Sequence, residues 1–368
     1  MSGDTRAAAA LFSPGRLRQA RQLKAITRAE LARQANVSAA AISQYESGAT
    51  RPKASTLQQL AWVLQVPVAF FTEPRTEPEL PSVTESFFRS LRSTTQRERE
   101  RAAAHAGLVT QLVAEIERHV ELPEYRPTTG LELTPSDPVE QAEHAARAVR
   151  DAWGLGHDPI PDVVRQLERR GLVVVRLLFE GARVDAFSWT GGPRPLVVLG
   201  RDKGVYERSR FDAAHELAHT VLHTADPTPA DAGMERQAHR FASAFLVPAE
   251  ALRDEWPEGR VDWARLLQLK ERWGMSVAAL LYRGKDVGVL TPQAHQNAMK
   301  YLSRKWGRQR EPGPDHPLEQ PALLNKALGV LEDAGITLDD LVQSARLPDA
   351  ATLRELLDLR ARRSLVVE

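Results

Sequence analysis

The chain has 368 residues, of which 42% are hydrophobic and 26% are charged, and its net charge of +1 excludes a polybasic nucleic-acid coat. It contains no cysteine, which excludes disulfides, thiolate catalysis and cysteine-bound zinc and fits a reducing cytoplasm. No apolar run reaches the roughly 18 residues of a membrane span, and no export signal is evident, so we expect a cytoplasmic protein of two or three domains without a membrane partner.

Residues 1–73 predict a bundle of five short helices. Thr27 and Glu30 form a capping box before the second helix, and Ser38 caps a third helix that stops at Gly48. The tight connection at Asn36 between these two helices indicates a helix-turn-helix. The predicted helices begin at Pro14, Arg28, Ala39, near Pro52 and at Pro67.

Four short motifs in this bundle closely resemble the Xre/Cro-type DNA-binding domain of phage and bacterial repressors. The motifs are Ala29-Glu30-Leu31-Ala32, Asn36-Val37-Ser38, Ile42-Ser43-Gln44-Tyr45-Glu46-Ser47-Gly48 and Arg51-Pro52. The resemblance implies that the third helix enters the major groove of a double-stranded DNA operator.

The charge of the bundle agrees with a DNA-binding role. Residues 1–73 hold nine basic and four acidic residues, a balance of +5, which suits phosphate contacts. Gln44 is the best candidate for reading an adenine edge, whereas we expect Glu46 to pack within the bundle. Because few polar readers remain, we expect a homodimer that reads two half-sites. The full set of expected DNA-binding residues is Arg28, Ser38, Ala39, Ala40, Ser43, Gln44, Arg51 and Lys53.

Two connecting segments follow the bundle. Residues 74–95 begin with three prolines among charges and predict an extended linker. Residues 96–125 predict a helical arm with an apolar stripe from Leu108 to Val120. That stripe could be buried against the second domain or against its twin in a dimer, and both alternatives stay open.

The segment 135–303 predicts a second domain with a small sheet. Strands are expected at 172–178, 186–189 and 195–199, before a helix that carries His215-Glu216-Leu217-Ala218-His219. Because residues four apart share a helix face, both imidazoles can bind one metal ion, and Glu216 can act as general base on a bound water. This is the signature of zinc hydrolases, which need a third protein ligand and one open position.

The third ligand has to come from another segment. His223 extends the same face, but eight helical residues rise about 12 Å, so one ion cannot bridge His215 and His223. We therefore expect His223 to pack at the end of its helix. Glu235 and His239 share a face of the next predicted helix, and both remain candidates. Tyr206, Arg210 and His223 are weak candidates for stabilising an oxyanion.

Two longer motifs closely resemble the ImmA/IrrE family of zinc metallopeptidases, known for cleaving repressors of mobile elements or stress regulons. They are the stretch from Arg208 to His219 and the stretch from Glu235 to Pro248. The resemblance implies that Glu235 completes the ligand set of His215 and His219, although His239 stands where many relatives carry asparagine. It further implies one Zn²⁺ per chain, with Mn²⁺ as the alternative, and hydrolysis with Glu216 as general base.

Residues 318–368 predict a helical C-terminal region, preceded by a basic linker at 304–317. A fragment at 335–341 is weakly similar to a second helix-turn-helix, and we interpret it as a packing or dimerisation element. The expected fold is α+β and mostly α: an N-terminal five-helix helix-turn-helix bundle, a zincin-like metallopeptidase domain with a small β-sheet, and the C-terminal helices.

The functional expectation is a DNA-binding transcriptional regulator with a zinc endopeptidase domain that cleaves a repressor or antitoxin-like protein, or the chain itself. The first alternative is a repressor whose peptidase-like domain only senses a ligand or partner. The second is a toxin–antitoxin component that uses DNA binding for autoregulation.

Overall fold

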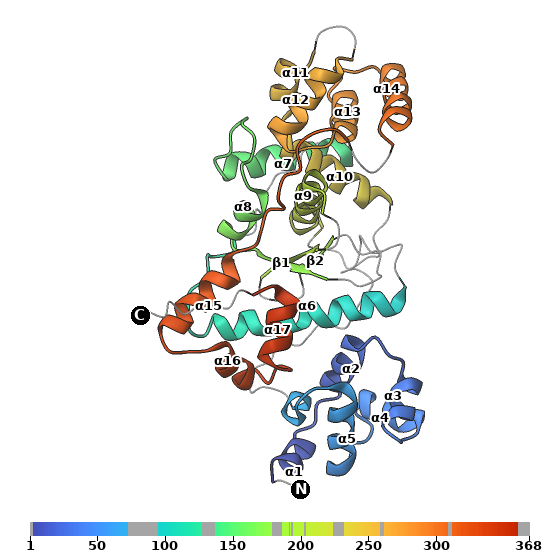
Figure 1. Cartoon of the computed structure of the whole chain (residues 1–368), viewed down its shortest axis with the longest axis vertical. Coiled ribbons are helices and arrows are strands. Elements are labelled where there is room, and N and C mark those ends of the chain that lie inside the picture. The colour runs from blue at the N-terminus through green and yellow to red at the C-terminus, as the bar shows by residue number, and fades with distance from the viewer. Residues whose placement is uncertain are drawn as a thin grey trace.

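The computed structural model describes residues 3–72, 95–126, 137–178, 186–190, 192, 194–201, 204–223, 232–257, 261–307 and 311–359. Residues 74–94 of the predicted linker and most of the loop after the His215 helix lie outside these residues. In the described part, helices dominate and surround one small sheet, which confirms the predicted fold class (Figure 1). No described helix combines the length and the apolar character that crossing a membrane requires.

The head, residues 3–72, contains the predicted helix-turn-helix. Both expected caps are present: Thr27 and Glu30 form the capping box, and the Ser38 hydroxyl accepts a hydrogen bond from the Ala41 N–H. Gly48 ends the third predicted helix in the left-handed region. A further helix, α1, was not predicted. The elements of the head are α1 (Gly3–Ala10), α2 (Pro14–Leu23), α3 (Arg28–Gln34), α4 (Ala39–Ser47), α5 (Ala54–Leu64) and the 3-10 helix η1 (Val68–Phe71).

The long helix α6 (Gln96–Ile116) lies between the head and the sheet (Figure 1). Almost every side chain from Ala102 to Ile116 is buried. The apolar core around α6 takes residues from the head, from one face of the sheet and from the C-terminal helices. The apolar stripe is therefore buried within the chain and cannot form a dimer contact with the same helix of a second chain.

A buried arginine connects the head to this core. Arg16 of α2 donates hydrogen bonds to the Gln111 side chain of α6 at 2.5 Å and to the Ala345 carbonyl at 3.4 Å. Its guanidinium also lies 5.0 Å from the centre of the Phe70 ring. Arg346 donates to the hydroxyl of Thr72. The head is thus held by α6 and by the C-terminal helices together.

The sheet has the order β1-β3-β2, with β1 parallel and β2 antiparallel to β3. Alternate side chains enter two different cores, as the pleat of a strand requires. Val173 and Val175 face the core around α6, whereas Val174 faces a second core around the His215 helix. The strands are β1 (Val173–Leu177), β2 (Ala186–Trp189) and β3 (Leu196–Gly200).

The second core holds the helix with His215 and the helices packed around it. Sequence patterns predicted six of these eight helices but missed α11 and α14. The elements are α7 (Pro138–Ala152), α8 (Val163–Arg169), α9 (Tyr206–Leu222), α10 (Ala232–Leu246), α11 (Ala249–Glu255), α12 (Trp263–Trp273), α13 (Val277–Asp286) and α14 (Pro292–Lys305).

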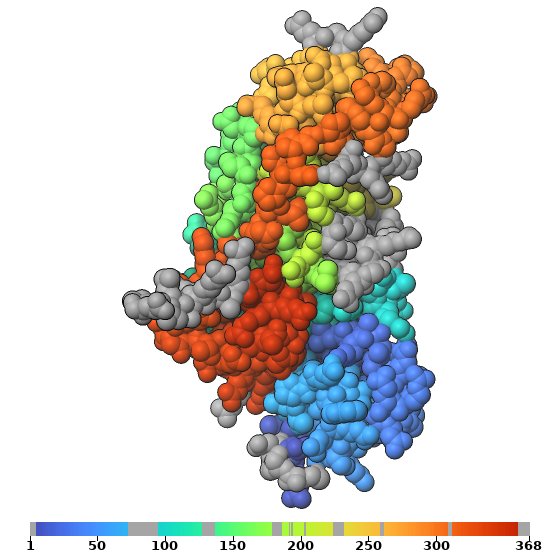
Figure 2. Space-filling view, viewed as in Figure 1, coloured from blue at the N-terminus to red at the C-terminus, as the bar shows by residue number. Residues whose placement is uncertain are grey.

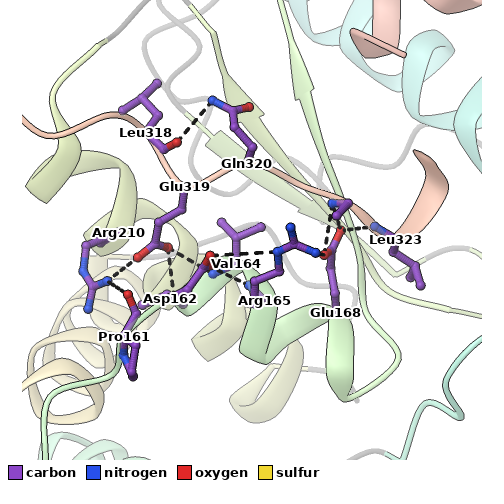
Figure 3. A network of polar contacts seen from close by, with 12 residues as sticks. Pro161, Asp162, Val164, Arg165, Glu168, Arg210, Leu318, Glu319, Gln320 and Leu323 are labelled. Atoms are coloured by element: carbon purple, nitrogen blue, oxygen red, sulfur yellow. Dashed lines mark hydrogen bonds and ion pairs between the residues drawn. The ribbon is translucent and has the colours of Figure 1, made fainter. Parts of the chain in front are cut away.

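An extended strap, residues 311–322, runs over the surface of this domain toward the C-terminal helices (Figure 2). Its carboxylates cap helices: Glu311 accepts from the Val277 N–H at 2.7 Å, and Glu319 accepts from the Val163 N–H at 2.9 Å. In return, Glu168 of α8 accepts from the N–H of Leu323 at 2.8 Å (Figure 3). Of the segment predicted as a linker, residues 304 and 305 end α14, and Glu311 fastens the strap to the start of α13.

The C-terminal helices repeat the backbone pattern of α2–α4. They are α15 (Leu323–Asp333), α16 (Leu338–Ser344) and α17 (Ala350–Leu357). Thr337 and Asp340 form a capping box like that of Thr27 and Glu30, and Arg346 has φ +52° where the head has Asn36 at φ +50°.

This C-terminal unit differs from the head in charge and in setting. Residues 323–359 hold seven acidic and three basic residues, which does not suit contact with phosphates. Leu353 and Leu357 of α17 belong to the core around α6, and α17 packs against β1. The fragment at 335–341 is thus part of a unit with helix-turn-helix geometry that packs inside the protein.

Candidate metal centre and DNA-reading surface

Helix α9 is held against the sheet on one side and against α10 on the other (Figure 1). Both helices present alanines to one another: Ala214 and Ala218 on α9, and Ala238 and Ala242 on α10, are completely buried. Small side chains allow helix axes to approach closely. This close packing brings the start of α10, which carries Glu235, beside the two histidines of α9.

The predicted metal ligands come together in the structure. The Nε2 atoms of His215 and His219 lie 3.2 Å apart, and the Glu235 carboxylate lies 3.4 Å from the first and 3.7 Å from the second. One ligand atom from each of the three residues lies within 4.8 Å of the other two. His215 and His219 are buried, and 22% of the Glu235 side chain is exposed.

These distances fit a shared cation. Donors bound at the roughly 2.0–2.1 Å typical of zinc lie about 3.3 Å from one another in a tetrahedral shell. Two imidazoles and one carboxylate also match the donor set of hydrolytic zinc sites, which leave one position open. In addition, the Oε1 atom of Glu235 is buried and has no hydrogen-bond partner among the described residues. The arrangement can therefore hold one divalent cation.

Glu216 lies beside this group and is almost completely buried, with 1% of its surface exposed. Burial raises the pKa of Glu216 to about 7, although the charge of His215 and a hydrogen bond from the Ser188 hydroxyl act in the opposite direction. Ser188 belongs to β2, one of the two edge strands of the described sheet. Its contact with Glu216 could not be inferred from sequence, because nothing in a short strand indicates what its serine faces.

For His215, several effects on the pKa compete. Burial lowers the pKa of its imidazole, but the hydrogen bond with Glu235 and the charge of Glu216 raise it, and the net shift is upward. A negative environment of this kind attracts a cation to the same place.

The other candidate residues of α9 and α10 do not belong to the group of three donors. His239 is exposed, and its ring packs 4.7 Å from the ring of His215, outside the group of three. His223 lies behind His219, with their Nδ1 atoms 3.0 Å apart. Arg210 and Tyr206 bond to one another, and Arg210 is paired with Glu319, so neither is directed at the three donors as an oxyanion partner.

The expected DNA-binding residues lie in the head, on and around α4. Ser38, Ala39, Ala40, Ser43 and Gln44 are all exposed. Among the expected phosphate contacts, Lys53 and Arg51 are exposed, and Arg51 donates to the Ala10 carbonyl at 2.8 Å.

A buried carboxylate organises the base of this surface. Glu46 is 1% exposed and pairs with Arg21 at 2.6 Å and with Arg28 at 2.7 Å. Burial raises the pKa of Glu46, but the two arginines outweigh this effect and lower it. Glu46 therefore packs within the head, as expected, and Arg28 already has one anionic partner in the protein.

Fold and site together define a helix-turn-helix protein with a peptidase-like domain built around an H-E-x-x-H helix. Residues 17–71 match the helix-turn-helix family model, and residues 167–285 match a peptidase family model described as the IrrE N-terminal-like domain. The chain thus joins an Xre-type DNA-binding domain to an IrrE/ImmA-like domain. No match was found among curated proteins.

Proposed function

We propose that this protein is a cytoplasmic transcriptional regulator that binds an operator through its head and hydrolyses a peptide bond in a partner protein at the α9–α10 site. The observation that carries the proposal is the convergence of His215, His219 and Glu235 beside the buried Glu216. The partner class we favour is a repressor or antitoxin-like protein, with cleavage of the chain itself as a special case.

We propose that His215, His219 and Glu235 hold one Zn²⁺, for which Mn²⁺ is the substitute. Bound there, the ion supplies Lewis-acid chemistry, which polarises a carbonyl and lowers the pKa of water to near 7.

Glu216 is the proposed general base. Its carboxylate takes a proton from the attacking water and returns it to the leaving amine, which needs a pKa near the working pH. Burial places the pKa of Glu216 at about 7 in the metal-free protein, and the Ser188 hydroxyl holds the carboxylate in place.

The edge strand β2 suggests how a polypeptide is presented. Among the described strands it pairs only with β3, so its other edge can accept an extended segment through main-chain hydrogen bonds. Because Ser188 of β2 contacts Glu216, a peptide bond aligned along this edge would lie near the base.

For the head, we propose that a homodimer reads two half-sites. Gln44 is the main candidate for base contact, and Arg51 and Lys53 contact phosphates. Since the stripe of α6 is buried within the chain, the dimer has to form through another surface.

The test uses the full-length chain loaded with zinc and incubated with purified products of neighbouring genes. We expect the wild type to yield fragments, and Glu216→Gln or a chelator to abolish them while Glu216→Gln retains one zinc per chain. Cleavage that persists in Glu216→Gln would show that Glu216 is not the general base.

The same experiment separates the alternatives. A zinc-loaded wild type that binds its operator but cleaves none of these proteins, while a partner shifts operator affinity, would favour the sensory regulator. Toxicity that persists in Glu216→Gln would favour the toxin–antitoxin reading.

A further inference from the structure

A chain of polar contacts starts from one of the proposed metal ligands. The Nδ1 atoms of His219 and His223 lie 3.0 Å apart, and His223 Nε2 lies 3.0 Å from Gln237 Oε1. Gln237 Nε2 donates in turn to the Pro138 carbonyl at 3.3 Å. The chain runs from α9 to α10 and ends at the first residue of α7, so three helices hold its members.

With His223 neutral, one arrangement of hydrogens satisfies all of these contacts. The Pro138 carbonyl only accepts, so the amide nitrogen of Gln237 faces it and the amide oxygen faces His223. That oxygen requires a hydrogen on His223 Nε2, which leaves Nδ1 of the same ring as an acceptor. His219 must then carry its hydrogen on Nδ1.

This arrangement of hydrogens also decides the state of Nε2, the second ring nitrogen of His219. With the hydrogen on Nδ1, Nε2 presents its lone pair, and this is the atom that lies 3.2 Å from His215 Nε2 and 3.7 Å from Glu235. A ligating histidine whose second nitrogen is hydrogen-bonded keeps its tautomer and its ring orientation.

We propose that His223 and Gln237 are positioning residues that fix the tautomer and the ring of His219 for metal binding, an inference that rests on the metal site proposed above. His223 is thus more than a packing residue at the end of its helix. The two ligating histidines differ in this respect, because the buried Nδ1 of His215 has no hydrogen-bond partner among the described residues.

The experiment measures zinc affinity of the full-length protein by competition with a chromophoric chelator, and records the visible spectrum of the Co²⁺-loaded form. We expect His223→Leu to weaken zinc binding by about 10–100-fold, the range found when such partners of metal ligands are removed. Gln237→Leu should weaken it in the same direction but less, because His223 can still accept from His219.

A conservative variant separates positioning from packing. His223→Asn retains an acceptor close to the place of Nδ1 and should recover much of the lost affinity together with the wild-type Co²⁺ spectrum. The matched control is His295→Leu, which removes another buried imidazole on α14 and should leave zinc affinity unchanged.

Two results would overturn the inference. One is wild-type zinc affinity and an unchanged Co²⁺ spectrum in His223→Leu and Gln237→Leu. The other is an equal loss in His223→Asn and His223→Leu with both variants folded, because this would indicate packing alone. A wild type that binds no zinc would instead refute the proposed metal site itself.

Discussion

Arg210 and Glu319 form a buried ion pair between α9, the helix of the proposed metal site, and the strap, although 109 residues separate them in the chain (Figure 3). Arg210 is 2% exposed and also donates to the Ile160 carbonyl at 2.7 Å. Burial raises the pKa of Glu319, while Arg210 and the helix N–H groups that it caps oppose this shift. The pair therefore joins α8, α9 and the strap at one point.

Removing one partner of this pair should be costly. We expect Glu319→Leu to lower the free energy of unfolding by about 3–5 kcal/mol, since it leaves the Arg210 charge buried without its carboxylate. The double variant Arg210→Met/Glu319→Leu should be less destabilised than Glu319→Leu. Denaturant unfolding measures both, and Glu124→Gln, which affects the exposed pair with Arg126, serves as a control with a change below about 1 kcal/mol. Equal stability of the single and double variants would contradict the assignment.

Glu216 should destabilise the metal-free protein at alkaline pH. Its pKa of about 7 in the folded state exceeds the ordinary value of 4.5, so the folded state keeps a proton that the unfolded state has lost between these values. Its contribution to stability is present below pH 4.5 and is lost as pH rises through 7. In chelator at pH 8, Glu216→Gln should therefore be more stable than the wild type by up to about 3 kcal/mol. Thermal unfolding from pH 4.5 to 8 checks this, with Glu140→Gln as an exposed control.

His105 should act in the opposite direction. Burial and the charge of Arg101 lower the pKa of His105 to about 4, so the unfolded state binds the proton first as pH falls. Stability should decline between pH 6.5 and 4 by up to about 3 kcal/mol for this group. His105→Gln should flatten that part of the stability profile, whereas exposed His157→Gln should not. An unchanged acid limb in His105→Gln would show that other groups cause it.

Zinc content should distinguish the two candidates on α10. Glu235→Ala removes a donor that lies 3.4 Å from His215 and should abolish stoichiometric binding. His239→Ala removes only a ring that packs on His215 and should retain one zinc per chain. Metal analysis after dialysis measures both. Loss of zinc in His239→Ala alone would reassign the third ligand.

Binding to the operator should separate base contacts from phosphate contacts. Gln44→Ala should cost about 1–3 kcal/mol at one base pair of the operator and spare non-specific DNA. Lys53→Ala should weaken binding to all duplexes alike. It should also reduce the slope of the logarithm of the binding constant against the logarithm of the salt concentration by about 1. Fluorescence anisotropy across a salt series measures both effects. A uniform loss in Gln44→Ala would argue against base reading by this residue.

Local patterns were enough to predict most helices and the approach of His215 and His219. Caps such as Thr27 and Ser38 act within one turn, and His215 and His219 share a helix face by spacing alone. Short or alanine-rich helices such as α1 and α11 were missed because they carry little apolar periodicity. For Glu235 the spacing left His239 equally open, and family resemblance was needed to choose.

The remaining features depend on the three-dimensional arrangement. Glu319 reaches α8 and α9 only because the strap folds back over the domain, and Ser188 reaches Glu216 from a neighbouring strand. The apolar stripe on α6 indicated that this helix is buried, but it did not show which segments cover it. Small residues outside the stripe, such as Ala102 and Ala106, are also buried in the core around α6. The apolar periodicity of a helix predicts which of its faces is buried, but not which segment of the chain packs against that face.

The enclosure of α6 has a geometric consequence for the molecule on DNA. The head and the peptidase-like domain share one apolar core through this helix. We therefore expect the two domains to keep one relative orientation when the head binds DNA. If α4 enters the major groove, as proposed above, its orientation there would fix the direction that His215 faces around the DNA axis. A second protein bound one full helical repeat away, about 10.5 base pairs, would lie on the same side of the duplex as the face that carries His215. A second protein bound half a repeat away would lie on the opposite side of the duplex.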